Sequence, residues 1–349
     1  FVDDITFACA DCDSTMVRVP EVIDCWYDSG AMPFAQWGYP HKAGSVEKFK
    51  ESYPADFICE AIDQTRGWFY TLMTIGTLVF DKSSYKTVLC LGHILDKDGR
   101  KMSKHVGNVL EPMALMDQHG ADAVRWYMLA AGSPWAARRV GHDAINEVVR
   151  KTLLTYWNTV SFHALYANAS AFDLSQRTKI ADRPLMDRWI ISELNLLIEE
   201  VDAALTDFDS QVAGRALARF IDDLSNWYVR RSRRRFWDGD VSALSTLHEC
   251  LVTLTQLLSP MVPFITEQVW QELVIPADSS AVASVHLSDF PVANAAVIDR
   301  ELGGQVALTR RIVELGRASR AESGIKIRQP LGRALIAASG WAALPEQMR

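Results

Sequence analysis

The hydrophobic spacing of this chain changes near residue 143, and this change limits the folds that it can adopt. Before that point, the apolar run KTVLCLGHIL (86–95) predicts a buried strand, and ADFICEAIDQ (55–64) predicts a strand that becomes a helix at about Gln64. After it, the 3.6-residue spacing of amphipathic helices is found in four segments, at 143–168, 185–206, 210–237 and 241–274. The pattern predicts a mixed α/β part followed by an all-α bundle.

Proline and glycine residues mark where these elements begin and end. Pro112 suits the first turn of a helix, and Gly120 predicts a break before the next one. The two prolines of SPMVPF (259–264) should interrupt the fourth helical segment. Residues 276–298 are rich in alanine and serine and predict a linker, and 299–324 predict a further helix.

The composition is that of an ordinary globular protein. Its 349 residues are 49% hydrophobic and 23% charged, enough for two or three domains. No apolar run approaches the roughly 20 residues of a membrane span. Six cysteines do not make a disulfide framework in a chain of this size, which favours a reducing, cytoplasmic setting. The sequence starts at Phe1 rather than Met and shows no signal peptide, so we expect a piece of a longer chain.

Two basic islands interrupt this acidic chain, whose net charge is −7. Residues 215–235 hold seven arginines against two aspartates, and residues 310–333 hold seven basic residues against two glutamates. Because local fields act independently of the net charge, the islands predict contact with a polyanion.

The loop GRKMSKHVGN (99–108) follows the apolar run KTVLCLGHIL (86–95) of the α/β part. A single basic turn is usually solvated surface, but ligands of α/β sheets bind at the carboxyl ends of strands. Gly99 and Gly107 allow the loop to move. Lys101 and Lys104 are point charges suited to a phosphate, and Ser103 adds a donor.

The segment KMSKH within this loop resembles the Lys-Met-Ser-Lys-Ser motif of class I aminoacyl-tRNA synthetases, with His105 in the last serine position. The segments VPEVIDCWYDSGAMPFAQ, ADFICEAIDQTRGWFY, GADAVRWYMLAAG and NWYVRRSRRRFW are similar in order and spacing to isoleucyl-tRNA synthetases. The resemblance implies the second half of a Rossmann-like catalytic domain with connecting helices (1–142), a helical anticodon-binding domain (143–275), and a linker and C-terminal junction (276–349).

The resemblance also implies an activity. The family uses ATP with Mg²⁺ to activate isoleucine and transfers it to tRNA(Ile), and it works as a cytoplasmic monomer. The family's His-Ile-Gly-His motif and editing domain are not found here, so we expect a C-terminal portion that is inactive alone. Two alternatives remain open: a valyl-tRNA synthetase, and a non-catalytic RNA-binding module.

The resemblance assigns candidate catalytic and adenylate-binding residues. Lys101, Lys104 and Ser103 are the expected catalytic residues of the loop. The residues expected to bind ATP or the adenylate are Glu60, Asp63, Gln64, Gly92, Ile94 and Met102. From the sequence alone, the N-cap of a helix is the better explanation of Asp63.

Two tryptophans are the implied walls of the amino-acid pocket. Trp26 and Trp68 suit a branched aliphatic side chain, although each is also explained by core packing.

The arginine run is the candidate tRNA-binding surface. The residues implied are Trp227, Arg230, Arg231, Arg233, Arg234 and Arg235, with Phe236 as a further stacking surface. Arg231 and Arg235 continue the apolar stripe of the helix, so an ion-paired bundle helix, with Asp222 or Asp223 as partner, is the alternative.

Cys9 and Cys12 form the one Cys-x-x-Cys pair. They supply at most two of the four ligands of a structural zinc, and no second pair follows. The sequence therefore favours a reduced or vestigial pair over a zinc site.

Overall fold

The computed structural model describes residues 2–20, 24–103 and 105–348. Its internal contacts divide the chain into two compact units. The first unit consists of residues 1–93 and 135–137, and the second of residues 94–134 and 138–349. The units therefore divide the chain at a different place from the predicted domains, which meet at residue 142.

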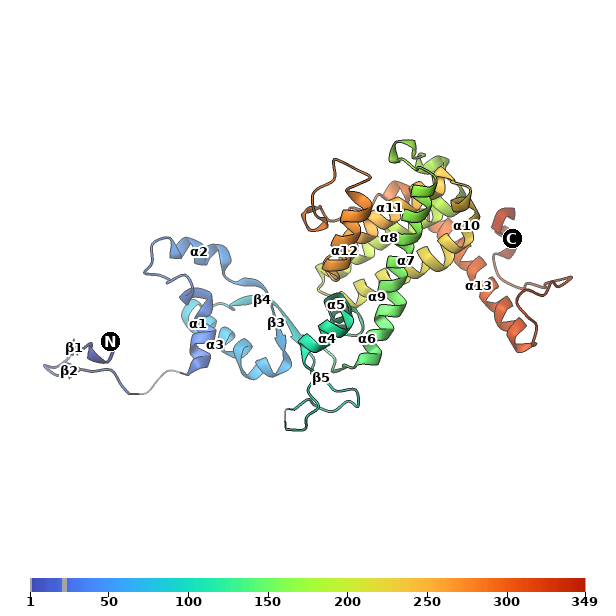
Figure 1. Ribbon diagram of the computed structural model, residues 1–349. Helices are drawn as coiled ribbons and strands as arrows, with labels where there is room; N and C mark the ends of the chain where they lie inside the picture. The colour runs from blue at the N-terminus through green and yellow to red at the C-terminus, as the bar shows by residue number, and fades with distance from the viewer. Residues whose placement is uncertain (1, 21–23, 104, 349) are drawn as a thin grey trace. The chain divides into compact units, whose positions relative to one another are not determined.

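A hairpin and two helices open the first unit (Figure 1). β1 (Phe7–Ala8) and β2 (Thr15–Met16) pair antiparallel and are exposed. α1 (Cys25–Ala35) begins at Asp24, whose carboxylate accepts a 2.7 Å hydrogen bond from the backbone N–H of Trp26. α2 (Ser45–Ser52) follows α1.

A β–α–β unit follows. β3 (Ala55–Ala61) and β4 (Tyr85–Leu91) pair in parallel, and α3 (Trp68–Phe80) connects them and packs on α1. Ile58, Phe69 and Leu72 form the small buried core. The predicted order of strand and helix is confirmed.

The predicted start of this helix at about Gln64 is wrong. Residues Ile62–Arg66 form a 3₁₀ turn, and α3 begins at Trp68. Gly67 separates them with a non-helical backbone (φ −141°, ψ −114°). A Cβ at Gly67 would lie 2.7 Å from Oε1 of Gln64 and 3.0 Å from the Trp26 ring, so this crowded turn favours glycine.

The prediction that the run 86–95 forms one buried strand is wrong. β4 ends at Leu91, and β5 (Ile94–Leu95) belongs to the second unit, where it pairs in parallel with β6 (Arg138–Arg139). Side chains alternate between half-buried and exposed along the first part of β4, and Val88 is 41% exposed. Among the described residues β4 pairs with β3 alone, so part of its surface stays open.

Two short helices follow the predicted loop in the second unit. α4 (Pro112–His119) has its proline at the first turn, as predicted. α5 (Ala121–Ala130) follows Gly120, whose φ of +86° lies in the region that favours glycine. Both predicted boundaries are confirmed.

The helical bundle contains α6 (His142–Val148), α7 (Leu154–Ala169), α8 (Leu185–Thr206), α9 (Ser210–Asp222), α10 (Arg230–Trp237), α11 (Val241–Leu258) and α12 (Pro263–Val269). Helical turns of π type join α6 to α7 and α9 to α10, and extend α12. The four predicted helical segments are confirmed, as is the break at the two prolines.

The bundle encloses the main hydrophobic core. The apolar stripe expected on the third segment is buried, with Leu217, Phe220, Ile221, Leu224 and Tyr228 all 3% exposed or less. By length and composition α11 could cross a membrane, but 67% of it is buried inside the bundle, as expected of a core helix. Carboxylate N-caps at Asp209 and Asp240 fix the starts of α9 and α11.

Residues 276–298 contain no α-helix among the described residues, but they are not a free linker. Val285 is 2% exposed, and the indole N–H of Trp270 donates a 2.8 Å hydrogen bond to the carbonyl of Val282. The segment therefore packs on the bundle. α13 (Arg300–Glu322) then confirms the last predicted helix and contacts α8.

Candidate functional site

The turn after β3 carries the predicted acidic residues of the first unit. Glu60 lies on β3 itself, and Asp63 and Gln64 lie in the 3₁₀ turn. The side-chain carbonyl of Gln64 accepts a 2.9 Å hydrogen bond from the backbone N–H of Trp68. Gln64, not Asp63, therefore provides the hydrogen-bond acceptor for a backbone N–H in the first turn of α3. The alternative of Asp63 as the N-cap is wrong. Glu60 and Asp63 are both exposed.

Both tryptophans lie next to Gly67. The Trp26 ring lies against Gly67, where a Cβ would come within 3.0 Å of it. The indole N–H of Trp68 donates a 3.1 Å hydrogen bond to the carbonyl of Ser29 in α1. Trp68 is half-buried and Trp26 is 41% exposed, so Trp68 is the more fixed of the two.

Gly92 and Ile94 lie in different units. A Cβ at Gly92 would overlap the backbone of Ala136, so this glycine is required by a close approach of the chain itself. Ile94 pairs with Arg138 between β5 and β6.

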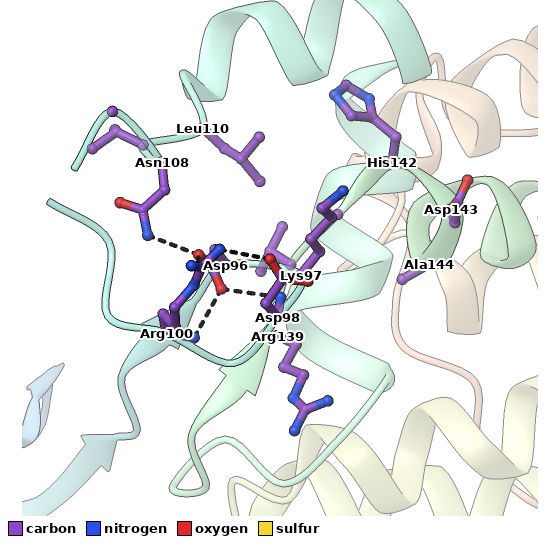
Figure 2. Close-up of a pocket in the computed structure, with 14 residues that line it drawn as sticks. Asp96, Lys97, Asp98, Arg100, Asn108, Leu110, Arg139, His142, Asp143 and Ala144 are labelled. Carbon is purple, nitrogen blue, oxygen red and sulfur yellow. Dashed lines mark hydrogen bonds and ion pairs between the residues drawn. The ribbon is translucent and has the colours of Figure 1, made fainter. Parts of the chain in front are cut away.

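The lysine loop is held at its base by two residues that the sequence reasoning missed. The Asp96 side chain, 8% exposed, accepts hydrogen bonds from the backbone N–H groups of Asp98 (3.0 Å) and Arg100 (2.8 Å). It also accepts a 2.8 Å hydrogen bond from the Asn108 amide, as Figure 2 shows. Hydrogen bonds, first among them that from Asn108, lower the pKa of Asp96.

Asn108 also connects the two arms of the loop. Its side-chain carbonyl accepts a 2.8 Å hydrogen bond from the backbone N–H of Ser103, and its amide donates to the carbonyl of Lys101 at 3.2 Å. Gly99 and Gly107 both have a positive φ, in the region that favours glycine. The signal in the sequence was Asp96, three residues before Gly99, and Asn108, directly after Gly107.

The predicted catalytic residues lie on the loop between these hydrogen bonds. Lys101 is exposed and pairs with Leu95 in an isolated β-bridge, and Met102 and Ser103 are half-buried. The Ser103 hydroxyl accepts a 3.3 Å hydrogen bond from the backbone N–H of His105. Lys104, the other predicted phosphate ligand, lies outside the described residues.

A cavity of about 590 Å³ adjoins the loop base (Figure 2). Its charged lining comes from the loop and the turn before it, from β6 and from the start of α6: Asp96, Lys97, Asp98, Arg100, Arg139, His142 and Asp143. Lys101 and Ser103 do not line it. The cavity therefore adds a site of mixed charge beside the catalytic candidates.

The arginine run divides into residues with different roles. Arg235 forms ion pairs with Asp187 at 2.5 Å and with Asp240 at 3.1 Å. Burial opposes the charge of Arg235, but its hydrogen bonds to the two carboxylates raise its pKa. Arg235 therefore holds the bundle together, and its assignment to the tRNA surface is wrong. The ion-paired alternative holds for this residue, with other partners than the predicted Asp222 and Asp223.

The aromatic side chains of the run are also covered. The guanidinium of Arg231 lies 4.6 Å from the Trp227 ring centroid, and that of Arg310 lies 5.2 Å from it. Phe236, expected as a stacking surface, is 0% exposed because it belongs to the core. Trp227 is half-buried beneath the two arginines.

The remaining arginines are on the surface. Arg234 is 90% exposed and forms a loose 3.9 Å ion pair with Asp238. Arg230 and Arg233 are exposed and have no ion-pair partner among the residues that the structure describes. These two line a polar pocket in the bundle.

Metal ligands do not gather in the described part of the chain: it has no group of three or more His, Cys, Asp or Glu residues placed to hold an ion. Cys9 and Cys12 are free thiols of the first hairpin. Hydrogen bonds with Ser14 lower the pKa of Cys12. These residues alone do not fit a closed zinc or magnesium site.

Known families match both parts of the chain. Residues 3–139 match tRNA synthetases class I (I, L, M and V), and residues 187–335 match the anticodon-binding domain of tRNA ligase. Solved structures share this fold. The LeuRS of Agrobacterium radiobacter, in a ternary LeuRS–tRNA–LeuAMS complex, has a TM-score of 0.64 at 20% identity over 84% of this chain and 36% of that one. Mycobacterium tuberculosis methionyl-tRNA synthetase with methionyl-adenylate has a TM-score of 0.59 at 21% identity, over 76% and 53%.

The relatives are named isoleucine–tRNA ligase. That of Streptomyces coelicolor is 64% identical, over 100% of this chain and 33% of the relative. Those of Thermobifida fusca and Cutibacterium acnes are 59% and 56% identical, over 100% of this chain and 34% of each relative. The chain belongs to the class I tRNA synthetases, in the isoleucyl-tRNA synthetase family. It spans about a third of the length of the curated relatives it matches.

Proposed function

We propose that this chain is the part of an isoleucine–tRNA ligase that carries the lysine loop of the ATP site and the anticodon-binding bundle. The observation that carries the proposal is the 64% identity to the Streptomyces coelicolor isoleucine–tRNA ligase over the whole chain. The substrates are then isoleucine, ATP and tRNA(Ile), with Mg²⁺ accompanying the ATP phosphates rather than held in a protein cage.

The chemical step is the transfer of an adenylyl group from ATP to isoleucine, without a covalent enzyme intermediate. A carboxylate oxygen of isoleucine attacks the α-phosphorus of ATP, and the bond from that phosphorus to the bridging oxygen breaks. Isoleucyl-adenylate and pyrophosphate are the products. Negative charge grows on the departing phosphates, and the ammonium groups of Lys101 and Lys104 stabilise it.

The loop base supports this role. Asp96 and Asn108 fix the two arms by hydrogen bonds of 2.8 to 3.0 Å, while the tip between them presents Lys101 to solvent. A fixed base holds Lys101 in position to close on the phosphates. Glu60, Asp63 and Gln64 would bind the adenylate, and Trp26 and Trp68 the isoleucine side chain.

The test is a segment exchange. The matching third of the Streptomyces coelicolor enzyme is replaced by this chain, and isoleucine-dependent pyrophosphate exchange and aminoacylation of tRNA(Ile) are measured. We expect both reactions to proceed. Activity with valine and tRNA(Val) instead would favour a valyl enzyme, and a well-folded chimera without pyrophosphate exchange would contradict the catalytic role.

The same chimera tests the loop. Lys101→Ala and Lys104→Ala should each reduce the rate of pyrophosphate exchange by about tenfold or more, with little change in the KM for isoleucine. Lys97→Ala, two residues beyond Leu95 on the same segment, is the matched control for loss of a nearby positive charge. An equal loss in all three variants would show that general charge, not the loop lysines, matters.

A further inference from the structure

Helix α5 of the second unit is joined to the strands that lead to the lysine loop. The Tyr127 hydroxyl of α5 donates a hydrogen bond to the carbonyl of Arg139 in β6. The Arg138 guanidinium of the same strand donates to the carbonyl of Tyr127 at 2.8 Å and to that of Met128. β6 pairs with β5, and Asp96 of the loop base follows β5 directly. The placement of α5 therefore fixes the placement of the loop base.

The first turn of α5 is also joined to the bundle, through Asp122. This residue is 8% exposed, and its carboxylate accepts hydrogen bonds from the backbone N–H groups of Phe264 (3.3 Å) and Ile265 (2.7 Å) at the start of α12. Such N–H groups have no partner within their own helix. Because the N-cap residue of α12, Val262, offers no side-chain acceptor, the carboxylate from α5 takes the place of a cap.

Arg125, one turn further along α5, contacts the turn that precedes α12. Its guanidinium donates hydrogen bonds to the carbonyls of Pro260 (2.9 Å) and Met261 (3.1 Å). The planar fork of an arginine suits two neighbouring carbonyls better than the single ammonium of a lysine. Asp122 and Arg125 together hold the turn between α11 and α12 and the start of α12 against α5, and we call these two residues the α5 clamp.

We propose that Asp122 and Arg125 are positioning residues for the transfer of isoleucine to tRNA. The α5 clamp fixes the bundle relative to the helix that holds the loop base. A tRNA bound to the bundle then presents its terminal ribose at one place relative to the lysine loop. The inference rests on the proposed function, because that function brings tRNA to the bundle and ATP to the loop.

The step that depends on the α5 clamp is the second one of the reaction. A terminal ribose hydroxyl of the tRNA attacks the carbonyl carbon of isoleucyl-adenylate and forms an ester bond. The bond from that carbon to the phosphate oxygen breaks, AMP leaves, and the hydroxyl proton passes to water. Activation of isoleucine involves no tRNA, so it should not need the clamp.

The experiment uses the Streptomyces coelicolor chimera described above. Arg125 is exposed, so Arg125→Ala should fold while it removes two of the hydrogen bonds of the clamp. Single-turnover transfer of isoleucine from the enzyme-bound adenylate to tRNA(Ile) should slow by about 10- to 100-fold, because a displacement of about 1 Å is enough for such a loss. Pyrophosphate exchange and the Kd for tRNA should be unchanged. Arg125→Lys should show an intermediate loss.

Two further variants separate positioning from general stability. Asp122→Asn, which keeps the shape of the side chain but not its charge, should slow transfer in the same way. Thr266→Val is the control for a weakened α12, because the buried Thr266 hydroxyl donates a 2.8 Å hydrogen bond to Val262, next to its own helix. This control should transfer isoleucine at the parent rate.

Three results would overturn the inference: an unchanged transfer rate in both Arg125→Ala and Asp122→Asn, an equal loss of transfer and of pyrophosphate exchange, or an equal loss of transfer in Thr266→Val. A chimera that is inactive before any of these substitutions would instead contradict the proposed function.

Discussion

The two units bury their apolar residues to very different extents. The first unit has a core cluster of Ile58, Phe69 and Leu72, while large side chains such as Tyr70 and Leu78 of α3 are 61% and 80% exposed. The bundle buries whole faces of α8, α9 and α11. Because stability follows buried apolar area, the bundle should be the stable part of the chain and the first unit the labile part.

The largest effect should come from breaking the ion pairs inside the bundle. Asp187→Ala removes the carboxylate that binds Arg235 and accepts a 2.9 Å hydrogen bond from Tyr228. Arg235 would keep only its ion pair with Asp240, and the buried Tyr228 hydroxyl would lose its carboxylate partner, so the free energy of unfolding should fall by about 3 kcal/mol. Urea unfolding followed by circular dichroism measures it.

Asp238→Ala is the matched control for that substitution. It removes only the exposed 3.9 Å pair with Arg234, and the change should stay within about 0.5 kcal/mol. A similar loss in the two variants would show that the Arg235 pairs add no more than surface charge.

The second-largest effect per residue should be a loss of bundle stability at acidic pH. Burial, together with the charge of the neighbouring imidazole, lowers the pKa of His163 to about 3, and burial lowers that of His248 to about 4. The unfolded chain takes up these protons at about pH 6.5 and the folded chain does not, so stability is full above that pH and falls below it. At pH 5 each histidine should cost about 2 kcal/mol relative to pH 7.

Urea titrations at the two pH values test this. The double variant His163→Leu and His248→Leu should lose most of the difference, although Arg177, Glu249 and Asp278 also face this region. No described histidine of the first unit is buried, so its amide exchange should not accelerate in the same pH range. A double variant with the parent's pH dependence would contradict the assignment.

Two glycines give a smaller effect, one in each unit. At Gly214 of α9 a Cβ would overlap Ala130 of α5, and at Gly76 of α3 it would lie 2.7 Å from the Tyr53 hydroxyl and 2.8 Å from the carbonyl of Lys82. Either alanine overpacks its contact at a cost of about 1–3 kcal/mol. Hydrogen exchange should show Gly214→Ala weakening all bundle helices and Gly76→Ala only α3 and β4. Loss of bundle protection in Gly76→Ala would show that the units unfold together.

The smallest effect should be local to the loop. In Asp96→Asn a neutral carbonyl replaces the carboxylate that accepts from Asp98 and Arg100. Neutral hydrogen bonds are weaker than charged ones by about 1 kcal/mol, so the amide of Arg100 should exchange about five times faster. Asp98→Asn, an exposed neighbour, should leave that exchange unchanged. Faster exchange throughout the bundle would show that Asp96 supports more than the loop.

Sequence patterns predicted the bundle better than the site. The helices at 185–206 and 300–322 were found almost to the residue, because an apolar stripe and its caps lie within one segment. The errors fell where backbone conformation or a distant partner decides. The non-helical backbone of Gly67 places the start of α3 at Trp68, later than predicted. Arg235 pairs with Asp187, which is 48 residues away in the sequence.

The motif residues followed the same division. The lysine loop and its two glycines were recognisable as a run of letters, whereas the role of Asn108 depends on contacts with Asp96, twelve residues away, and with Ser103. The sequence could not distinguish Arg233, without an ion-pair partner among the described residues, from Arg235, because both are arginines in one run.

The sequence alone determined the family, the change from α/β to helical structure, and the position of the cationic loop. Each of these depends on spacing within a short stretch of chain, where periodicity and turn chemistry act. Only the tertiary structure decided which arginines are free, which aromatic rings are covered, and how α5 joins the loop base to the bundle. Burial and ion pairing join residues that are distant in sequence, and no local pattern encodes those partners.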